Sequence, residues 1–552
     1  MSRPFKFFER VKSRLDPLSY HAKGNHNMLF FNTAGPVNCD DHYCLPPLSR
    51  FDLEEILMLI AQKKYFVLHA PRQTGKTSCL LALMKYLNEQ GNYECLYINV
   101  EAAQAMRENI FEAMRIILVE MATRASIVFE NDFFEKIWQD TLEQKKTMAL
   151  NQILTRWSKT SQKPKILLVD EIDSLVGDTL ISVLRQLRSG YDRRPHSFPQ
   201  SIILCGIRDV RDYRIHSSAE KTIITGGSAF NIKAESLRLG DFTKNEMTQL
   251  YQQHTEITDQ IFSDHAIETA WELSEGQPWL VNALAYEVAW KMKQMRDRTI
   301  TITDEHIQKA GQNLIVRRET HIDQLIDKLR EERVQKVIEP ILMGENTPEK
   351  AHDDDISYVK DLGLVKIDST IRIANRIYQE VIPRALTFST QVTISHETSW
   401  YIRETDGTID FNKLMRAFQD FFRKHSEKWC NGFQYREAAV QLLLQAFLQR
   451  IVNNGGYIFR EYGLGRQRTD LLIIWHKGKQ KQEVVIELKI RRGNTQKTIK
   501  KGLEQTWAYM DKCGASEGHL VIFDQRKSRS WKEKIFYEIE YHNDCGLHIW
   551  GM

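Results

Sequence analysis

The stretch that decides the fold is Tyr65–Ser78, which reads YFVLHAPRQTGKTS. Its first five residues are mostly apolar, which is typical of a short buried strand. A polar, glycine-containing segment follows, and Thr77–Asn88 then have the apolar spacing of a helix. The stretch therefore predicts a strand, a tight loop and a helix in direct succession.

The loop has the residues and the context of a phosphate-binding loop, the Walker A motif. Backbone N–H groups and the helix N-terminus would surround the phosphates of ATP. We expect Lys76 to reach the β- and γ-phosphates and the Thr77 hydroxyl to hold Mg²⁺. Ala70 stands at the first glycine of the motif, where a small residue suffices. The nucleotide-binding residues predicted from the loop are Arg72, Gln73, Thr74, Gly75, Lys76, Thr77 and Ser78.

A second apolar segment, Ile166–Val169, ends in the acids Asp170 and Glu171. Such a buried strand places both acids at its carboxyl end, as a Walker B motif does. We expect Asp170 to hold the Mg²⁺ shell and Glu171 to polarise the attacking water as a catalytic residue. Asp173 is interpreted as a solvated or capping acid.

A third strand is expected at Ser201–Gly206, and Arg208 follows its end. An arginine at this position can sense the γ-phosphate of the nucleotide. Arg211 or Arg214 could act in trans, which would require a homo-oligomer. Surface pairing of these arginines with neighbouring aspartates explains them equally well.

The order of these motifs resembles that of the AAA-like ATPases of the STAND type and their archaeal-ATPase relatives. Gly276-Gln277-Pro278 resembles the GxP motif of that group's helical lid, which implies that Pro278 closes near the nucleotide. Residues 355–378 resemble the winged-helix domain that follows the lid, which in this group either binds DNA or packs as a regulatory domain. The resemblance implies an α/β P-loop NTPase with a parallel sheet, a helical lid and a winged helix.

The C-terminal part of the chain carries a second set of charged residues on two expected antiparallel strands, separated by a polar turn at His476–Gln482. Alternation places Glu487 and Lys489 on one face, and pairing in register brings Asp470 beside them. Two adjacent carboxylates repel each other unless a cation joins them, and Mg²⁺ prefers oxygen ligands. A metal-bound water oriented by Lys489 would hydrolyse a phosphodiester.

This pattern resembles the PD-(D/E)xK nuclease superfamily, with Asp470 as the first acid and Glu487-Leu488-Lys489 as the ExK motif. Thr469 stands in place of the proline. The resemblance implies a C-terminal α/β restriction-endonuclease-like domain whose metal ligands are Asp470 and Glu487. A salt-bridged strand pair without activity is the alternative reading of the same residues.

Three more residues match that superfamily. Gln505 and Tyr509 are four residues apart and therefore share a face of the next expected helix. Glu437, on the helix before the strands, matches an acid that is often contributed from that helix. The resemblance thus implies catalytic roles for Gln505 and Glu437. Trp507 could stack on a base, but core packing is the preferred interpretation.

Basic residues are concentrated in the same region. From residue 397 onward there are 26 lysines and arginines against 19 acids, compared with 50 and 53 in the remainder. Such an excess favours contact with phosphates, although we expect about half of these side chains to be ordinary surface charges. The basic residues flanking the expected nuclease site are Arg466, Arg468, Arg491, Arg492, Lys497, Lys500 and Lys501.

Composition excludes several protein classes. The 552 residues are 42% hydrophobic and 27% charged, and there is neither an 18-residue apolar run nor a secretory signal. We therefore expect a cytoplasmic protein that does not contact the membrane.

Most of the eight cysteines lie within apolar runs, as free buried thiols do. The segment Cys39–Cys44 contains residues that bind metals but has no second half at zinc spacing, so no metal is expected there.

The resemblance extends from Phe31 to the last residue and suggests a bacterial family that fuses an AAA-like ATPase to a PD-(D/E)xK domain. We expect an ATP-binding, Mg²⁺-dependent nuclease that cuts DNA under control of the nucleotide state, in defence against phage or mobile DNA or in genome maintenance. RNA is an open alternative substrate. A nucleotide-gated scaffold or a DNA-binding ATPase with an inactive nuclease fold are alternative functions.

The expected divisions are a basic extension at 1–27, the ATPase core at 28–235, the lid at 236–300, the winged helix at 301–390, a linker at 391–400 and the nuclease-like domain at 401–552.

Overall fold

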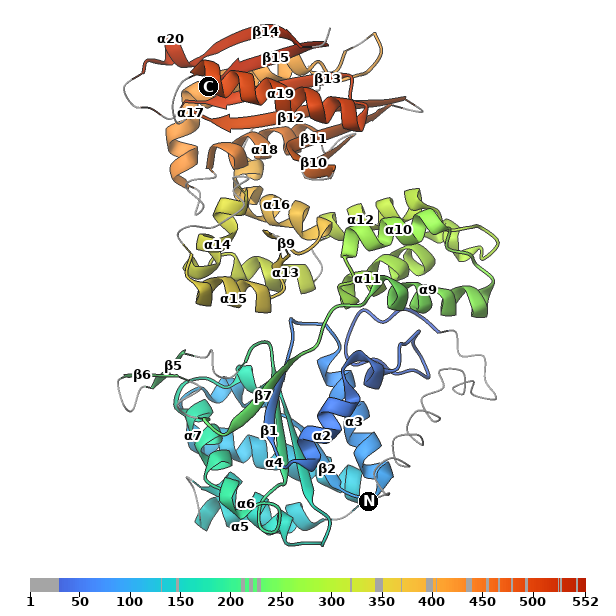
Figure 1. Ribbon diagram of the computed structural model, residues 1–552, viewed down its shortest axis with the longest axis vertical. Coiled ribbons are helices and arrows are strands. Elements are labelled where there is room, and N and C mark those ends of the chain that lie inside the picture. Colours follow the sequence, from blue (N-terminus) through green and yellow to red (C-terminus); the bar gives the residue numbers. More distant parts are fainter. Residues whose placement is uncertain are drawn as a thin grey trace, which may run out of the picture. The chain divides into compact units, whose positions relative to one another are not determined.

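The chain divides into two compact units, Met1–Leu314 and Ile315–Met552, which are described separately. Figure 1 labels the helices and strands of the chain. The computed structural model describes residues 29–130, 132–144, 148–209, 214–217, 222–225, 230–317, 320–342, 351–368, 370–393, 401–403, 405–432, 439–452, 456–464, 467–477, 480–491, 495–524, 526, 529–542 and 545–552.

A five-stranded parallel sheet forms the centre of the first unit, with the strand order β2-β3-β4-β1-β7. The strands are β1 (Tyr65–His69), β2 (Glu94–Asn99), β3 (Lys165–Asp170), β4 (Ser201–Gly206) and β7 (Lys233–Arg238). β1, β3 and β4 are buried along their whole length, as their apolar sequences predict. The expected parallel α/β sheet is confirmed.

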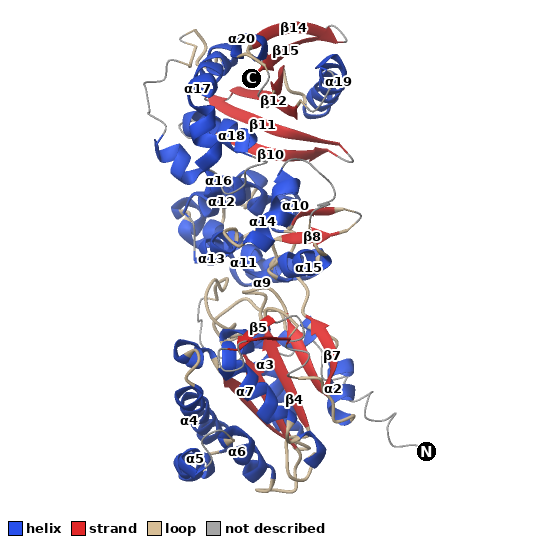
Figure 2. Cartoon of the chain, turned by 90° about the vertical axis from the view of Figure 1, so that its left-hand side faces the viewer, coloured by secondary structure: helices blue, strands red, loops and turns tan. Residues whose placement is uncertain are grey.

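Helices cover both faces of this sheet (Figure 2). Phe66 and Leu68 of β1 belong to a core formed with α2 and α3, whereas Tyr65 and Val67 belong to a core formed with α4, α6 and α7. Alternation along the strand therefore divides its side chains between two cores. The helices are α2 (Leu53–Ala61), α3 (Lys76–Gln90), α4 (Ile110–Phe129), α5 (Phe133–Gln144), α6 (Ala149–Ser158) and α7 (Gly177–Arg188). Shorter elements are the 3₁₀ helices η2 (Pro47–Arg50), η3 (Glu101–Met106), η4 (Ile172–Ser174) and η5 (Tyr191–Arg193) and the hairpin of β5 (Arg214–Ser217) and β6 (Thr222–Thr225).

A helical subdomain follows β7 in the same unit. Its first helix begins with a capping box, in which the Thr243 and Glu246 side chains each accept a backbone N–H at the helix start. The elements are α9 (Lys244–Thr258), α10 (Asp264–Ser274), α11 (Pro278–Tyr286), the π-helix η7 (Glu287–Lys291), the 3₁₀ helix η8 (Lys293–Arg296) and α12 (Asp304–Arg317).

The second unit begins with a small helical part that contains a two-stranded antiparallel hairpin. The helix and hairpin expected within residues 355–378 are confirmed. α16 continues to Thr393, so the first residues of the expected linker 391–400 are helical, and 394–400 lie outside the described residues. The elements are α13 (Thr320–Lys328), α14 (Glu332–Leu342), α15 (Asp353–Asp361), β8 (Val365–Ile367), β9 (Ile371–Ile373) and α16 (Arg376–Thr393).

A six-stranded mixed sheet, β10-β11-β12-β13-β15-β14, completes this unit. β10, β11 and β12 form an antiparallel meander, and β13 lies parallel to β12 after the crossover helix α19. Figure 2 shows α19 on one side of these strands and α17 and α18 on the other. The elements are α17 (Phe411–Gly432), α18 (Ala439–Val452), β10 (Gly456–Leu464), β11 (Gln467–Lys477), β12 (Gln480–Ile490), α19 (Thr495–Cys513), β13 (Glu517–Phe523), α20 (Trp531–Lys534), β14 (Phe536–His542) and β15 (Cys545–Gly551).

Two local features differ from expectation. β11 and β12 pair as far as Lys477 with Gln480, so most of the expected turn His476–Gln482 is strand, because backbone hydrogen bonds do not require apolar side chains. Cys39 and Cys44 form a disulfide, because the turn between them brings their Cα atoms to 5.4 Å. Cys79, Cys95 and Cys205 are free and buried, as predicted.

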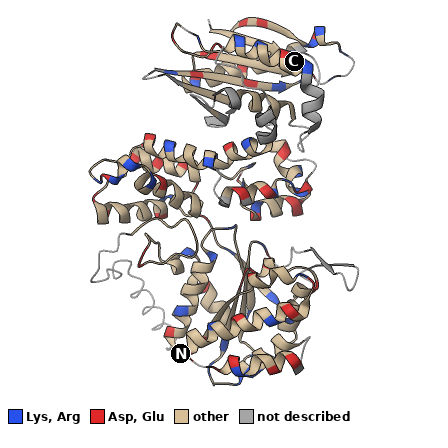
Figure 3. Ribbon diagram, turned by 180° about the vertical axis from the view of Figure 1, so that it is seen from behind, with Lys and Arg blue, Asp and Glu red and all other residues tan. Residues whose placement is uncertain are grey.

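Figure 3 marks the charged residues along the ribbon, and most of those in the first unit belong to helices and loops. Within the described ranges, every helix is too short or too polar to cross a membrane.

Candidate functional site

The loop between β1 and α3 leaves the N-terminus of α3 open. Gly75 caps the helix with φ of 93° and makes no side-chain cap hydrogen bond. Gln73 also has a positive φ, 58°. The Lys76 ammonium is buried and donates hydrogen bonds to the carbonyls of Ala70 at 3.0 Å and Pro71 at 2.9 Å. The loop therefore curls around its own lysine beside a helix terminus that attracts anions.

Thr77 and Asp170 meet at the carboxyl end of β3. The Thr77 hydroxyl donates to Asp170 Oδ2 at 2.7 Å, and the Tyr97 hydroxyl donates to the same oxygen at 3.0 Å. The Glu171 N–H donates to Asp170 Oδ1 at 2.9 Å. Sequence reasoning brought Thr77 and Asp170 together but missed Tyr97, which reaches them because β2 lies beside β3.

Glu171 is held at the end of β3 with φ of 56°, a conformation that is uncommon for a non-glycine residue. Burial raises the pKa of its carboxyl to about 7, the Lys76 charge opposes this rise, and Asp173 and Asp170 add to it. Asp173 is not merely solvated, because its Oδ1 accepts the Ile207 N–H at 3.2 Å. This hydrogen bond connects the segment after β3 to the segment after β4.

Arg208 is half-buried just beyond β4. The neighbouring Asp209 forms a buried ion pair with Lys233 of β7. Arg211 lies outside the described residues, and Arg214 begins β5 with a side chain that is also outside them.

The Gly276-Gln277-Pro278 turn begins α11, with Pro278 in the first turn and the Gln277 side chain accepting the Leu280 N–H at 2.6 Å. Gly276 has φ of 78°, and a Cβ there would lie 2.0 Å from the carbonyl oxygen of Phe242. Only glycine fits this contact between α11 and the segment before α9.

A pocket lies between the phosphate-binding loop, the helical subdomain and the segment before η2. Its lining includes Thr74, Gly75 and Ser78 of the loop together with Pro278 and Trp279 of α11. The Trp279 indole donates to the Thr33 carbonyl at 2.9 Å, and the Val37 N–H donates to Ser78 Oγ at 2.9 Å. The segment that precedes the first predicted helix thus closes one wall of the pocket.

Arg50 was missed by sequence reasoning, which assigned no role to it. Its guanidinium donates to Thr74 O at 3.4 Å and to Gly240 O at 2.6 Å, and it stacks over the Phe242 ring at 4.3 Å. Burial lowers the pKa of this arginine. Arg50 therefore joins the phosphate-binding loop to the start of the helical subdomain, and the sequence carries no motif that reveals this contact.

The second group of predicted residues lies on the sheet of the second unit. Glu487 pairs in register with Leu520, and Lys489 pairs with Ile522. Leu520 and Ile522 belong to the core formed with α19, so both charged residues face α19. Glu487 is buried, and Lys489 Nζ donates to Glu487 Oε1 at 2.5 Å.

The remaining residues of that prediction are only partly described. Asp470 lies on β11, next to Leu471, which pairs with Ile486 of β12. Because the two strands are antiparallel, the next pair in this register places the Asp470 backbone opposite Glu487. Its side chain and Glu437 lie outside the described residues.

α19 brings further predicted residues to the same face. Gln505 Oε1 is buried and has no hydrogen-bond partner among the described residues. Tyr509 is buried in the core with α19. Trp507 packs against this core, with its ring 5.4 Å from that of His542.

The flanking basic residues differ in their surroundings. Lys497, Lys500 and Lys501 are exposed on α19, whereas Arg491 forms an ion pair with Asp524. Arg466, Arg492 and the side chain of Arg468 lie outside the described residues.

A match to a sequence family supports the interpretation of the first unit as a P-loop ATPase. The sequence model of a family described as "AAA-like domain" matches residues 50–382, which is more than half of the chain. A Walker-type ATPase of Pyrococcus abyssi is 16% identical, with 64% of this chain and 99% of that chain covered and a TM-score of 0.42. For Cdc6p of Pyrobaculum aerophilum the identity is 15%, the coverage 66% and 97%, and the TM-score 0.35. The RuvB Holliday junction branch migration motor of Thermotoga maritima is 12% identical, with 59% of this chain and 94% of that chain covered and a TM-score of 0.31. We found no match among curated proteins.

Proposed function

The chain belongs to the AAA-like domain family and is a P-loop ATPase of that type. From this premise we propose that the second unit is a Mg²⁺-dependent nuclease that cuts DNA, and that nucleotide binding in the first unit controls it. The ATPase residues fit Mg-ATP. The Thr77 hydroxyl and the Asp170 carboxylate, 2.7 Å apart, are oxygen ligands of the kind Mg²⁺ prefers. Bound Mg²⁺ would neutralise phosphate charge.

The protein groups around the nucleotide then have separate tasks. Lys76 and the open N-terminus of α3 bind phosphates, and Arg208 contacts the γ-phosphate. Glu171 accepts a proton from the attacking water, for which a carboxyl pKa of about 7 is well suited at neutral pH. Arg50 and Pro278 couple the helical subdomain, which is the lid, to nucleotide in the pocket. Both residues lie where the phosphate-binding loop and the helical subdomain meet.

One observation carries the nuclease part of the proposal: Glu487, Lys489 and the buried Gln505 carbonyl share the face of the sheet that α19 covers. A buried oxygen without a hydrogen-bond partner suits a cation or its bound water. Asp470 and Glu487 would supply the carboxylates, and Lys489 would orient the water. The meander followed by a crossover helix and a parallel strand supports a restriction-endonuclease-like fold.

DNA is the proposed substrate because basic residues exceed acids from residue 397 onward. Defence against phage or mobile DNA is the setting we propose, by analogy of architecture alone. Arg211 or Arg214 acting in trans would make the active form a homo-oligomer.

The test is cleavage of plasmid DNA by the purified full chain with Mg²⁺ or Mn²⁺, with and without ATP. We expect Asp470→Ala and Lys489→Ala to abolish cleavage and Lys76→Ala to alter it, whereas Asp511→Ala, at an exposed position of α19, preserves it. If wild type and Asp470→Ala are equally inert on DNA and RNA while ATP is still hydrolysed, the protein is a nucleotide-gated scaffold with an inactive nuclease fold.

A further inference from the structure

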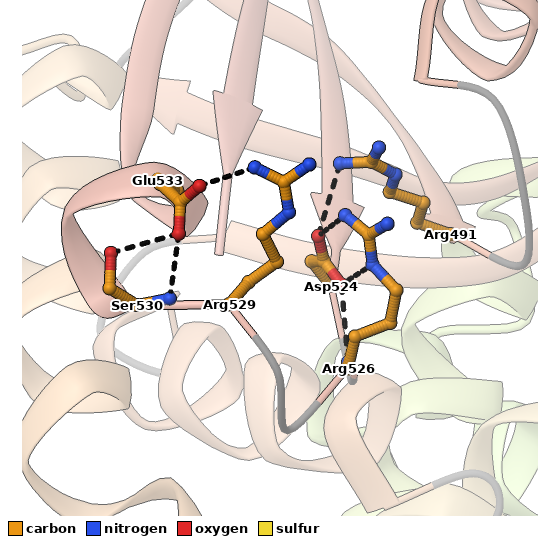
Figure 4. Close-up of polar contacts among 6 residues, drawn as sticks. All are labelled: Arg491, Asp524, Arg526, Arg529, Ser530 and Glu533. Atoms are coloured by element: carbon orange, nitrogen blue, oxygen red, sulfur yellow. Dashed lines mark hydrogen bonds and ion pairs between the residues drawn. The ribbon is translucent and has the colours of Figure 1, made fainter.

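Two arginines meet one aspartate at the carboxyl ends of β12 and β13. Arg491 directly follows β12, and Asp524 directly follows β13. Figure 4 shows Arg491 and Arg526 converging on the Asp524 carboxylate. None of the activities assigned above uses Asp524 or Arg526.

The three side chains are fastened in a defined geometry. Arg526 donates from Nε to Asp524 Oδ1 at 2.9 Å and from Nη2 to Oδ2 at 2.7 Å, a bidentate pair. Arg491 Nη1 donates to Oδ2 at 3.1 Å. The backbone adds support, because the Arg491 N–H donates to Phe523 O at 2.9 Å and the Arg526 N–H donates to Asp524 Oδ1 at 3.1 Å.

Burial and charge separate this cluster from an ordinary surface ion pair. The Asp524 side chain is 7% exposed, whereas that of Arg526 is 37% exposed. The carboxylate is thus enclosed while one guanidinium remains accessible. Two guanidinium groups therefore share one buried carboxylate. In the same loop, Arg529 has its own acid, Glu533, in a pair with both side chains about half exposed.

The cluster lies on the same face of the sheet as the proposed nuclease residues. Every second residue of a strand has its side chain on the same face. This places Glu487, Lys489 and Arg491, along β12 and its extension, on one face of the sheet. Ile522, which faces α19, is followed two residues later by Asp524. Two residues of a strand span about 6.6 Å, so the arginines begin about one nucleotide beyond Lys489.

We propose that Arg526, with Arg491 beside it, is a phosphate-binding site that holds the DNA backbone next to the phosphodiester at Glu487 and Lys489. This inference rests on the proposed nuclease function of the second unit. Asp524 is a positioning residue, which orients both guanidinium groups before DNA arrives. A guanidinium already fixed by a bidentate pair loses little conformational entropy on binding, and its remaining N–H groups match phosphate geometry.

The experiment measures binding of the full chain to a short fluorescein-labelled forked DNA by fluorescence anisotropy, in EDTA so that no cleavage occurs, over a series of salt concentrations. We expect Arg526→Ala to weaken binding about tenfold and to reduce the slope of log affinity against log salt by about one. Arg526→Lys should fall between wild type and Arg526→Ala, because it retains the charge without the fork. Arg529→Ala is the matched control and should change affinity less than twofold.

The outcomes separate the two proposals. If wild type binds and cleaves DNA while Arg526→Ala and Arg529→Ala behave alike, the phosphate site is wrong and the nuclease stands. If wild type binds DNA with the expected Arg526 dependence but never cleaves it, the phosphate site stands and the nuclease activity is wrong. If wild type neither binds nor cleaves DNA, both are wrong.

Discussion

The Thr77 hydroxyl donates a hydrogen bond to Asp170 Oδ2 over 2.7 Å, although 93 residues separate the two in the chain. Thr77 belongs to the first turn of α3 and Asp170 to the end of β3. The contact forms because β1, which leads into α3, and β3 are parallel strands of one sheet whose carboxyl ends lie at the same edge. The two motifs therefore make one site.

Asp170→Asn should reduce ATP hydrolysis by at least a hundredfold, because it removes the charge that would hold Mg²⁺ while leaving a similar shape. Steady-state phosphate release measures this. Tyr97→Phe is the matched control, since it removes only the hydroxyl that donates to the same oxygen at 3.0 Å. A loss of a few-fold is expected for it. Equal losses in both variants would argue that Asp170 acts only through the local hydrogen bonds.

Hydrolysis should depend on pH through Glu171. A general base must be deprotonated, and burial raises the pKa of this carboxyl to about 7. The turnover rate should therefore rise with pH, reach half of its maximum near pH 7 and level off about one pH unit higher. Glu171→Gln should retain ATP binding and lose hydrolysis. A rate that is flat between pH 6 and 8 in wild type would contradict the assignment.

Gly276→Ala should lower the free energy of unfolding of the first unit by about 3 kcal/mol, because it combines a left-handed backbone with a backbone clash. The added Cβ would lie 2.0 Å from Phe242 O. Gly240→Ala, in the neighbouring segment, is the control, because a Cβ there meets nothing within 4 Å. Thermal denaturation compares the two variants, and similar melting temperatures would show that the turn can relax.

Asp524→Asn should destabilise the second unit by about 2 kcal/mol at neutral pH. Hydrogen bonding to Arg526, with the Arg491 charge, lowers the Asp524 pKa from 3.8 to about 2. A lowered carboxyl pKa contributes stability above about pH 4 that is lost as the pH falls toward 2. The difference between wild type and variant should shrink accordingly in denaturant unfolding at decreasing pH. Asp511→Asn, at an exposed position of α19, should show no such pattern.

Local sequence determined the elements that carry the sites. Apolar runs such as Ile166–Val169 form strands because parallel strands are buried on both faces, and Gly276-Gln277-Pro278 begins a helix because proline needs no N–H donor in the first turn. The spacing of Glu487 and Lys489 likewise assigned them to one face of a strand, since the side-chain period of a strand is two. These features depend on neighbouring residues alone.

Tertiary structure decided which distant groups meet. Tyr97 reaches Asp170 only because β2 is placed beside β3, and Arg50 reaches Thr74 only because the chain before η2 folds back over the phosphate-binding loop. Arg491 and Arg526 share Asp524 because β12 and β13 are joined in parallel by α19. No local period or motif encodes such contacts. They follow from strand order and from burial, which the whole chain determines together.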